Sequence, residues 1–363
     1  MENDVGHAPQ HPAPAKLLEV AGLVAEFRTR AGTVRAVDGI NLTVMAGETL
    51  ALVGESGCGK SATALSMMRL ISPSVGHVGG SVRFEGTELM SLPPSAVRAI
   101  RGRRIAMIFQ DPMTSLNPVL PIGLQLTETL KAHLGLRGAA ARERARELLA
   151  RVGIPDPARR LRDFPHQLSG GMRQRVMIAM SLSCNPRLIL ADEITTALDV
   201  TIQAVVLDLL KQLSRDAGTA ILLITHDLGV VAGMADRVAV MYAGQIVETA
   251  STATLFARPA MPYTWGLLDS LPRMDEDSRR RLVPIPGMPP SLIAPPPGCR
   301  FAPRCTYRRD ICTQSTPDLA PVPGAAAPHL VRCWGSQDVA GGGWLIGHNR
   351  HAQPSAEQPE VVS

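Results

Sequence analysis

Four short apolar segments constrain the fold of this chain more than any other feature. They read ETLALVG at 48–54, RIAMIFQ at 104–110, RLILADE at 187–193 and AILLITHD at 220–227. Stretches of helical composition lie between or after them, at 60–70, 139–152, 169–184 and 201–216. Short, fully apolar strands separated by helices are typical of a parallel sheet that is buried on both faces. We therefore expect an α/β domain.

Further strands are predicted at both ends of this domain. LLEVAGLVAEFRT and INLTVMAG near the N-terminus alternate in polarity and are separated by a glycine turn, which favours an antiparallel sheet. Residues 236–250 indicate a hairpin that turns at Ala243 and Gly244. Beyond it, residues 284–297 contain seven prolines, which exclude a long helix or central strand there.

Composition excludes several classes of protein. The net charge of +5, from 37 basic and 32 acidic residues, is small for 363 residues, so we expect no nucleic-acid partner. The sequence contains no run of 18 apolar residues that could span a bilayer. The N-terminus carries Glu2 and Asp4 and lacks the apolar core of a secretory signal. We expect a chain that stays in the cytoplasm, where most thiols are reduced.

Residues 54–61, GESGCGKS, match the phosphate-loop pattern GxxxxGK[ST]. The motif follows an apolar strand and opens a helix, which is the context that it requires. Glycines let backbone N–H groups turn toward phosphate oxygens, and the helix N-terminus adds its positive dipole end. Lys60 is expected to reach the β- and γ-phosphates, and the Ser61 hydroxyl to ligate Mg²⁺.

The apolar segment 187–193 ends in two carboxylates, Asp192 and Glu193. Downstream of a phosphate loop, we expect Asp192 to hold Mg²⁺, and Glu193 to accept a proton from the attacking water. A second glycine-containing motif, LSGGM at 168–172, lies between the two. A serine hydroxyl and glycine N–H groups at the start of a helix form another anion site.

LSGGM resembles the signature of ABC-type ATPases, whose common form is LSGGQ. The resemblance implies that two nucleotide-binding domains pair head to tail, so that Ser169, Gly170 and Gly171 of one close on phosphates held by the other. It identifies Gln110 with the Q-loop, and Ala197, Leu198 and Asp199 with the D-loop. It also identifies His226 with the switch histidine and Phe27 with the aromatic side chain that stacks on adenine. The ATP-binding residues so implied also include Gly54, Glu55, Ser56, Gly57, Cys58, Gly59, Lys60, Ser61, Ala62, Gln110 and Asp192, and the catalytic ones Glu193, His226, Gln110 and Lys60.

The sequence departs from the family pattern at one position. The family usually reads Asp-Glu-Pro-Thr after the acidic strand, whereas this chain has Ile194 between Glu193 and Thr195. The change removes a fixed φ just after the expected base. Because the base itself remains, we expect hydrolysis to survive.

FPHQLSGGMRQR at 164–175 and IFQDPMTSLNP at 108–118 resemble peptide and nickel importer ATPases. Residues 262–268 and 284–289 are similar to the C-terminal extension of those subunits. The resemblance implies two integral membrane permease subunits, a second ABC ATPase subunit and an extracytoplasmic solute-binding protein, with this chain peripheral on the cytoplasmic face of the membrane. The expected organisation is a disordered lead (1–16), a nucleotide-binding domain (17–258) with a helical subdomain at about 112–185, an extension (259–335) and a disordered tail (336–363).

The extension carries four cysteines, Cys299, Cys305, Cys312 and Cys333. None forms a CxxC pair, so neither a zinc ribbon nor a bacterial ferredoxin pattern fits. The same cluster in peptide-importer ATPases implies a [4Fe–4S] cluster, while structural zinc and unliganded thiols remain open.

Three functions compete with peptide import. They are a nickel or oligosaccharide importer ATPase, an exporter ATPase, and a soluble ABC ATPase of DNA repair or translation. The C-terminal extension argues against an exporter. The soluble class typically has two nucleotide domains or a long coiled coil, and the sequence shows one copy of each motif and no heptad run.

Overall fold

The computed structural model of the protein describes residues 15–111, 115–195, 199–270, 284–325, 328–337 and 345. The described residues include no helix that is both long and apolar enough to cross a membrane. The predicted N-terminal lead and C-terminal tail fall almost wholly outside them.

An eight-stranded mixed sheet forms the centre of the molecule, in the order β11-β12-β10-β9-β3-β8-β7-β6. Strands β9, β3, β8, β7 and β6 run parallel, and β10, β12 and β11 pair antiparallel. The strand bounds are β3 Thr49–Val53, β6 Ile105–Ile108, β7 Leu188–Asp192, β8 Ala220–Thr225, β9 Arg237–Tyr242, β10 Gln245–Ser251, β11 Ala320–Pro321 and β12 Leu330–Val331. The carboxyl ends of β3, β6, β7 and β8 therefore lie along one side of the sheet, where polar residues that follow them can meet.

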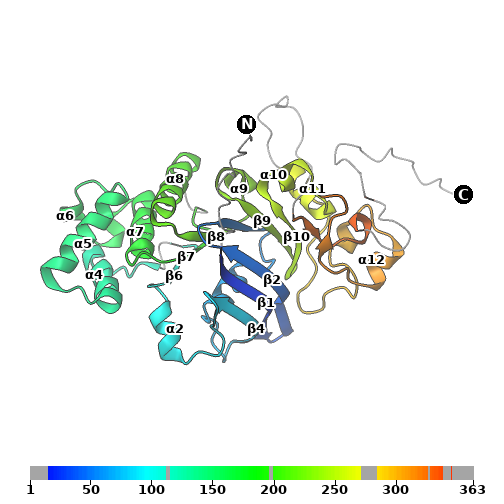
Figure 1. Ribbon diagram of the computed structural model, residues 1–363, viewed down its shortest axis with the longest axis horizontal. Helices are drawn as coiled ribbons and strands as arrows, with labels where there is room; N and C mark the ends of the chain where they lie inside the picture. The colour runs from blue at the N-terminus through cyan, green and yellow to red at the C-terminus, as the bar shows by residue number, and fades with distance from the viewer. Residues whose placement is uncertain are drawn as a thin grey trace, which may run out of the picture.

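A second sheet is antiparallel and has the order β2-β1-β4-β5. Its strands are β1 Lys16–Thr29, β2 Gly32–Met45, β4 Gly76–Phe84 and β5 Thr87–Glu88. Apolar residues from β1, β2 and β4 pack with residues of β3, β7 and β8 in one core cluster, with Leu23, Val37 and Val82 fully buried. This shared core fixes the small sheet against the phosphate-loop strand β3. In Figure 1, β1, β2 and β4 lie below β8 and β9 of the central sheet.

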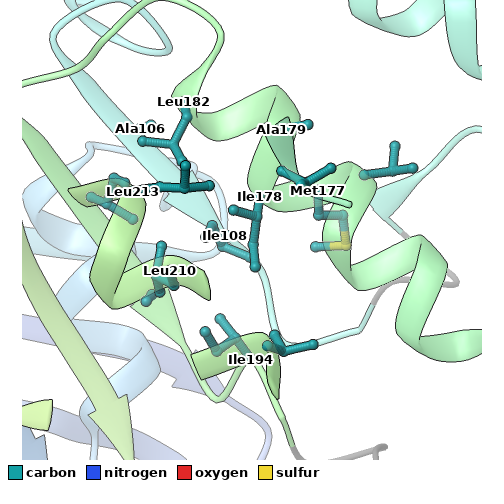
Figure 2. Packing of buried hydrophobic residues seen from close by; sticks show 14 of the residues in the cluster. Ala106, Ile108, Met177, Ile178, Ala179, Leu182, Ile194, Leu210 and Leu213 are labelled. Carbon is teal, nitrogen blue, oxygen red and sulfur yellow. The ribbon is translucent and has the colours of Figure 1, made fainter. Parts of the chain in front are cut away.

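Helices complete the fold, and several of them gather beyond β6 on one side of the molecule (Figure 1). The helices are α1 Lys60–Met67, α2 Pro94–Ile100, α4 Ile122–Leu134, α5 Gly138–Arg151, α6 Pro157–Arg160, α7 Gly170–Leu182, α8 Val200–Ala217, α9 Leu228–Met234, α10 Thr252–Ala257, α11 Pro262–Asp269 and α12 Asp310–Gln314. Ile178 of α7, Leu210 of α8 and Ile108 of β6 are buried in one cluster, which joins these helices to the sheet (Figure 2). Burying each such side chain contributes roughly 1.5–3 kcal/mol.

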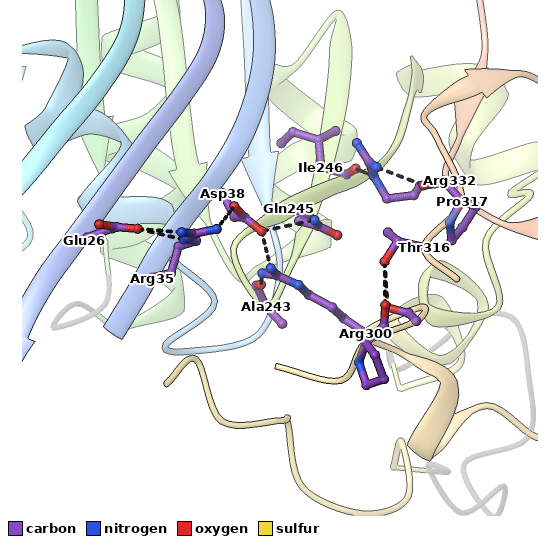
Figure 3. A network of polar contacts seen from close by, with 12 residues as sticks. Glu26, Arg35, Asp38, Ala243, Gln245, Ile246, Arg300, Thr316, Pro317 and Arg332 are labelled. Carbon is purple, nitrogen blue, oxygen red and sulfur yellow. Dashed lines mark hydrogen bonds and ion pairs between the residues drawn. The ribbon is translucent and has the colours of Figure 1, made fainter. Parts of the chain in front are cut away.

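The C-terminal part, meaning the described residues from 259 onward, lies on the opposite side of the molecule from α4 and α5 and includes α11 and α12 (Figure 1). Its strand β12 pairs with β10, so it extends the central sheet. Polar contacts add to this join: Arg300 donates to the Asp38 carboxylate and to the carbonyl of Ala243, and Arg332 donates to the carbonyl of Ile246 (Figure 3). Burial lowers the pKa of the Arg300 guanidinium, and the charge of Asp38 opposes that shift.

The prediction of an α/β fold with an antiparallel sheet, a helical portion and a cysteine-containing C-terminal part is confirmed. The four apolar segments form parallel strands, and the hairpin turns at Ala243 and Gly244 as expected. Strand β4 and the short strands β5, β11 and β12 were not predicted from the sequence. The domain boundaries given above stay a prediction.

Candidate functional site

The phosphate loop, residues 54–61, joins β3 to the first residues of α1, and backbone packs closely against its two outer glycines. A Cβ on Gly54 would lie 2.1 Å from the carbonyl oxygen of Met241, and one on Gly59 would lie 2.1 Å from that of Ala36. Both glycines also have positive φ, 156° and 110°. Only glycine fits these two positions, because the close approach and the left-handed backbone both exclude a side chain.

Lys60 lies folded into this loop. Its ammonium donates to the carbonyl oxygens of Gly54 at 2.9 Å and Glu55 at 3.0 Å, and its side chain is only 4% exposed. These neutral acceptors satisfy the charge while leaving it next to the loop's N–H groups. A phosphate that enters the loop would therefore find a positioned cation.

Three residues, Ser61, Gln110 and Asp192, are predicted to hold Mg²⁺, and two of them, Ser61 and Asp192, lie in direct contact. The Ser61 hydroxyl donates to Asp192 Oδ1 at 3.0 Å, although the residues are 131 positions apart in sequence. Burial raises the pKa of the Asp192 carboxyl, and the nearby charge of Glu193 adds to the effect. A hydroxyl and a carboxylate at this distance fit the oxygen ligands that Mg²⁺ prefers.

The Glu193 carboxylate is the meeting point of the other predicted catalytic residues. Gln110 Nε2 donates to one oxygen at 2.7 Å, while His226 Nδ1 and Lys60 Nζ lie 3.5 and 3.7 Å from the other. Glu193 follows β7, and its φ of 45° turns it out of the strand direction. Gln110 follows β6 and His226 follows β8, so three neighbouring parallel strands deliver these side chains to one place.

The signature motif lies at the start of α7. Ser169 caps this helix by accepting a hydrogen bond from the Met172 N–H at 3.4 Å, and Ser169 and Gly170 are exposed. Gly171 is close to α8, since a Cβ there would lie 2.7 Å from Ile202 Cγ2. Asp199 caps α8 by accepting from the Ile202 N–H, whereas its predicted D-loop partners Ala197 and Leu198 lie outside the described residues.

Phe27 lies on β1 and is partly buried against the core that the two sheets share. It pairs with Gly76 of β4, where a Cβ would lie 3.3 Å from the phenyl ring. This packing accounts for the residue without a ligand. Its predicted stacking on adenine stays a prediction.

Residues of the C-terminal part also contact the phosphate loop, and the sequence analysis missed them. Arg304 forms a two-point ion pair with the Glu55 carboxylate, and the Tyr263 hydroxyl accepts from the Glu55 N–H at 2.9 Å. Arg304 and Glu55 are separated by 249 positions. Tyr263 lies in the segment 262–268 that resembles the family extension, but nothing local to either residue indicates a contact with a loop more than 200 positions away.

The four predicted cluster cysteines line one small pocket of about 20 Å³, together with Phe301, Tyr307 and Leu345. This volume has room for about one water molecule between the side chains. Burial raises the pKa of Cys305 to about 12 and that of Cys333 to about 11, so both thiols are protonated at neutral pH. Within the described residues, no group of three or more histidine, cysteine or acidic side chains is arranged to hold a metal ion. The predicted [4Fe–4S] cluster therefore gains no support from this geometry, although its four donors do converge.

The relatives of this chain match it over most of its length. A family model described as "ABC transporter" matches residues 37–196, and one described as "Oligopeptide/dipeptide transporter, C-terminal region" matches residues 247–312. The oligopeptide transport ATP-binding protein OppD of Bacillus subtilis is 51% identical over 88% of each chain. The chain belongs to the ABC transporter ATP-binding subunits of the oligopeptide/dipeptide family. OppD of Salmonella typhimurium is 49% identical over 87% of this chain and 94% of its own, and a putative peptide import ATP-binding protein of Brucella abortus is 51% identical over 86% and 94%.

Solved structures agree with this ABC assignment. The ADP- and phosphate-bound dimer of the ATP-binding cassette MJ0796 has a TM-score of 0.57 and 28% sequence identity, and the match covers 65% of this chain and 99% of the cassette. This chain is thus an ABC-type ATPase with the cassette fold.

Proposed function

We propose that this chain binds and hydrolyses ATP to energise the import of di- or oligopeptides across the cytoplasmic membrane. The observation that carries the ATPase part is the convergence of Gln110, His226 and Lys60 on Glu193, beside the contact of Ser61 with Asp192. The peptide substrate is supported by the family matched by residues 247–312 and by the names of relatives that are about half identical to the chain.

Each residue has a defined part in this reaction. Loop N–H groups and Lys60 would bind the β- and γ-phosphates. Ser61, Asp192 and Gln110 would hold Mg²⁺, whose charge would offset that of the phosphate oxygens. Glu193 takes the proton of the attacking water, and His226 contacts the γ-phosphate. Lys60 and Glu193 lie 3.7 Å apart in this structure. When ATP binds, Lys60 must turn from Glu193 toward the phosphates, which leaves the Glu193 carboxylate free to accept the proton of water.

A second subunit would complete the site. Ser169 and Gly170 are exposed at the start of α7, where their hydroxyl and N–H groups can face phosphates held by another nucleotide-binding domain. We expect a head-to-tail pair with a second copy or with a related ABC subunit. Phe27 would stack on adenine, and Asp199 would lie at the interface.

The proposed transporter also contains two integral membrane permease subunits and an extracytoplasmic solute-binding protein. The subunit described here would bind the permease pair from the cytoplasmic face of the membrane. Affinity purification of the tagged full chain from membranes tests this arrangement. Recovery of integral membrane subunits supports it, whereas recovery of soluble proteins alone favours a soluble ABC ATPase.

Uptake measurements test the substrate. Cells that carry the complete transporter should accumulate labelled dipeptide, and the same cells with Lys60→Ala should not, because the loop then lacks its cation. Labelled nickel and a labelled oligosaccharide serve as comparison substrates. Uptake of nickel or the sugar in place of peptide would contradict the proposed substrate while leaving the ATPase assignment intact.

Substitution of the proposed base tests the chemistry. Glu193→Gln should lower ATP turnover by the assembled complex at least about 100-fold, because general-base catalysis typically contributes that much. ATP binding should persist, as the amide keeps the size of the side chain. Glu147→Gln, on the exposed face of α5, is the matched control and should retain turnover. Unchanged turnover in Glu193→Gln would remove Glu193 from the reaction.

We further propose that the four-cysteine pocket binds a metal group, with a [4Fe–4S] cluster as first candidate and zinc as second. The convergence of four thiols on one pocket supports this proposal, and the pocket would have to widen as the thiols deprotonate. Iron, sulfide and zinc analysis after anaerobic purification tests it. A preparation that lacks all three and shows these cysteines as free thiols would refute it.

A further inference from the structure

The phosphate loop is held from outside the nucleotide-binding motifs, by the C-terminal part. Arg304 ends the 3₁₀ turn Ala302–Arg304, and its side chain is 4% exposed. It donates to both oxygens of the Glu55 carboxylate, at 2.7 and 3.0 Å. Glu55 is the second residue of the GESGCGKS loop, directly after Gly54.

The surroundings of Arg304 fix its guanidinium in one orientation. Its Nε donates to the Pro286 carbonyl at 2.9 Å, and its terminal nitrogens also reach the Tyr242 hydroxyl and the Ile285 carbonyl, each at 3.3 Å. Together with the two bonds to Glu55, these contacts provide an acceptor for each of its five N–H groups. The hydrogen bond to Glu55 is the main cause of the raised pKa of Arg304. A buried guanidinium satisfied in this way is a rigid support.

The Glu55 backbone is held at the same time. Tyr263, which is fully buried, accepts from the Glu55 N–H through its hydroxyl, and Lys60 donates to the Glu55 carbonyl at 3.0 Å. Tyr263 packs against Tyr242 and Phe301, with ring centroids 4.5 and 5.5 Å away. The C-terminal part therefore binds two polar groups of Glu55, its carboxylate and its N–H. The Glu55 carbonyl accepts from Lys60, the lysine that is expected to bind the phosphates.

The charge of Glu55 gives these contacts a further consequence. A carboxylate in an anion-binding loop opposes the approach of a triphosphate, since like charges repel strongly where the protein excludes water. Arg304 neutralises that carboxylate and binds it on the side of the C-terminal part. Removing the guanidinium would release the loop and leave its negative charge uncompensated.

We propose that Arg304 is a positioning residue for ATP, which holds the phosphate loop in its binding conformation through Glu55. The C-terminal part is thereby a component of the nucleotide site in this chain, in addition to any contact it makes elsewhere. The inference rests on ATP being the ligand of this loop. Arg304 itself acts only through Glu55 and is not assigned a contact with the nucleotide.

Nucleotide affinity of the full-length chain tests the inference, measured by titration with a fluorescent ATP analogue. Arg304→Ala should weaken binding about tenfold, because it breaks two charge-assisted hydrogen bonds. Arg304→Lys should recover part of that loss, because lysine keeps the positive charge beside Glu55. The recovery should be incomplete, because one ammonium cannot make the two-point contact. Arg308→Ala, an exposed arginine four positions later, is the matched control and should bind ATP as the wild-type chain does.

Two further measurements separate positioning from general stability. In ATP hydrolysis by the assembled complex, Arg304→Ala should raise KM about tenfold while kcat stays near the wild-type value. The double variant Glu55→Gln with Arg304→Ala should bind ATP no more weakly than Arg304→Ala alone, since both changes break one interaction. Thermal melting and circular dichroism verify folding, and Glu55→Gln breaks the pair from the loop side if Arg304→Ala does not fold.

The outcomes are distinguishable. If the wild-type chain does not bind ATP, the proposed function fails before this inference is reached. If the wild-type chain binds ATP and both Arg304→Lys and Glu55→Gln match it, the inference is overturned and the proposed function stands. Additive losses in the double variant would likewise overturn it, because Arg304 would then act by a route other than Glu55.

Discussion

Ile194 follows the proposed base, at the position where the Asp-Glu-Pro-Thr pattern that this chain resembles has proline. Its side chain is 3% exposed and packs in the cluster that contains Ile108 and Ile178 (Figure 2). Proline would fix its own φ but would fill less of this space. Isoleucine therefore lacks the fixed φ of proline but packs in the cluster with residues of β6 and α7. Glu193 still contacts Gln110, His226 and Lys60.

Truncation of Ile194 tests that account. Ile194→Ala should lower the free energy of unfolding by about 2–4 kcal/mol, because it leaves a cavity in a closely packed cluster. ATP turnover per folded molecule should persist, as the base is untouched. Urea denaturation measures the first and phosphate release the second. Val205→Ala on the exposed face of α8 should change stability by less than about 0.5 kcal/mol, and equal losses in both variants would contradict the packing account.

Individual site residues differ in how well the sequence predicts them. Lys60, Gln110, Glu193 and His226 follow apolar strands in a fixed order, and the parallel sheet then brings them together. Arg304 carries no such signal, because its contact with Glu55 depends on where a segment 249 positions away packs. Distances within the site, such as 3.7 Å between Lys60 and Glu193, also depend on tertiary packing and could not be anticipated.

Strand β10 illustrates the same distinction for secondary structure. Its hairpin with β9 was predicted, because two strands and a tight turn are a local pattern. Its pairing with β12 was not, because β12 has only two residues and lies about 80 positions later. Strand β4, GHVGGSVRF, was missed because glycine weakens the strand pattern. Long-range pairing supplies what these segments lack in local propensity.

The pairing of β10 with β12 is reinforced by a buried contact between a glutamate and a histidine. Glu248 is fully buried and lies 2.7 Å from His329 Nε2, and it also accepts from the N–H groups of Ala260 and Met261. His329→Ala should lower the free energy of unfolding by about 1–3 kcal/mol, because the carboxylate loses one of its buried partners. His77→Ala, at an exposed position of β4, should have little effect. Chemical denaturation of both variants measures the difference, and equal stability would show that the backbone bonds alone suffice.

The molecule as a whole presents its two anion-binding motifs differently. The phosphate loop is held at Glu55 by the C-terminal part, and its tip, Ser56 and Gly57, is exposed. The signature motif lies on another part of the surface, where Ser169 and Gly170 are exposed at the start of α7. A surface-exposed motif suits a partner subunit, and the cassette whose structure resembles this chain was solved as a dimer with ADP and phosphate.

The variant Ser169→Arg should distinguish the role of the signature motif from that of the phosphate loop. The variant should bind ATP at its own phosphate loop with unchanged affinity, because Ser169 belongs to another part of the surface. Turnover by the assembled complex should fall about 100-fold, since the arginine side chain blocks closure on the partner's nucleotide. Equilibrium binding and phosphate release measure the two effects, with Ser95→Arg on α2 as the exposed control. Full turnover in Ser169→Arg would contradict the paired arrangement.

The antiparallel addition of β12 to β10 bears on how this protein can be divided. A fragment that stopped at residue 270 would lack β12, so β10 would become the edge strand of the central sheet and its backbone at Glu248 and Thr249 would lose its partners. It would also strand the Glu248 carboxylate without His329 and free Glu55 from Arg304. Such a trimmed ATPase should be prone to self-association through the bare strand, so the minimal catalytic fragment of this subunit includes its C-terminal region.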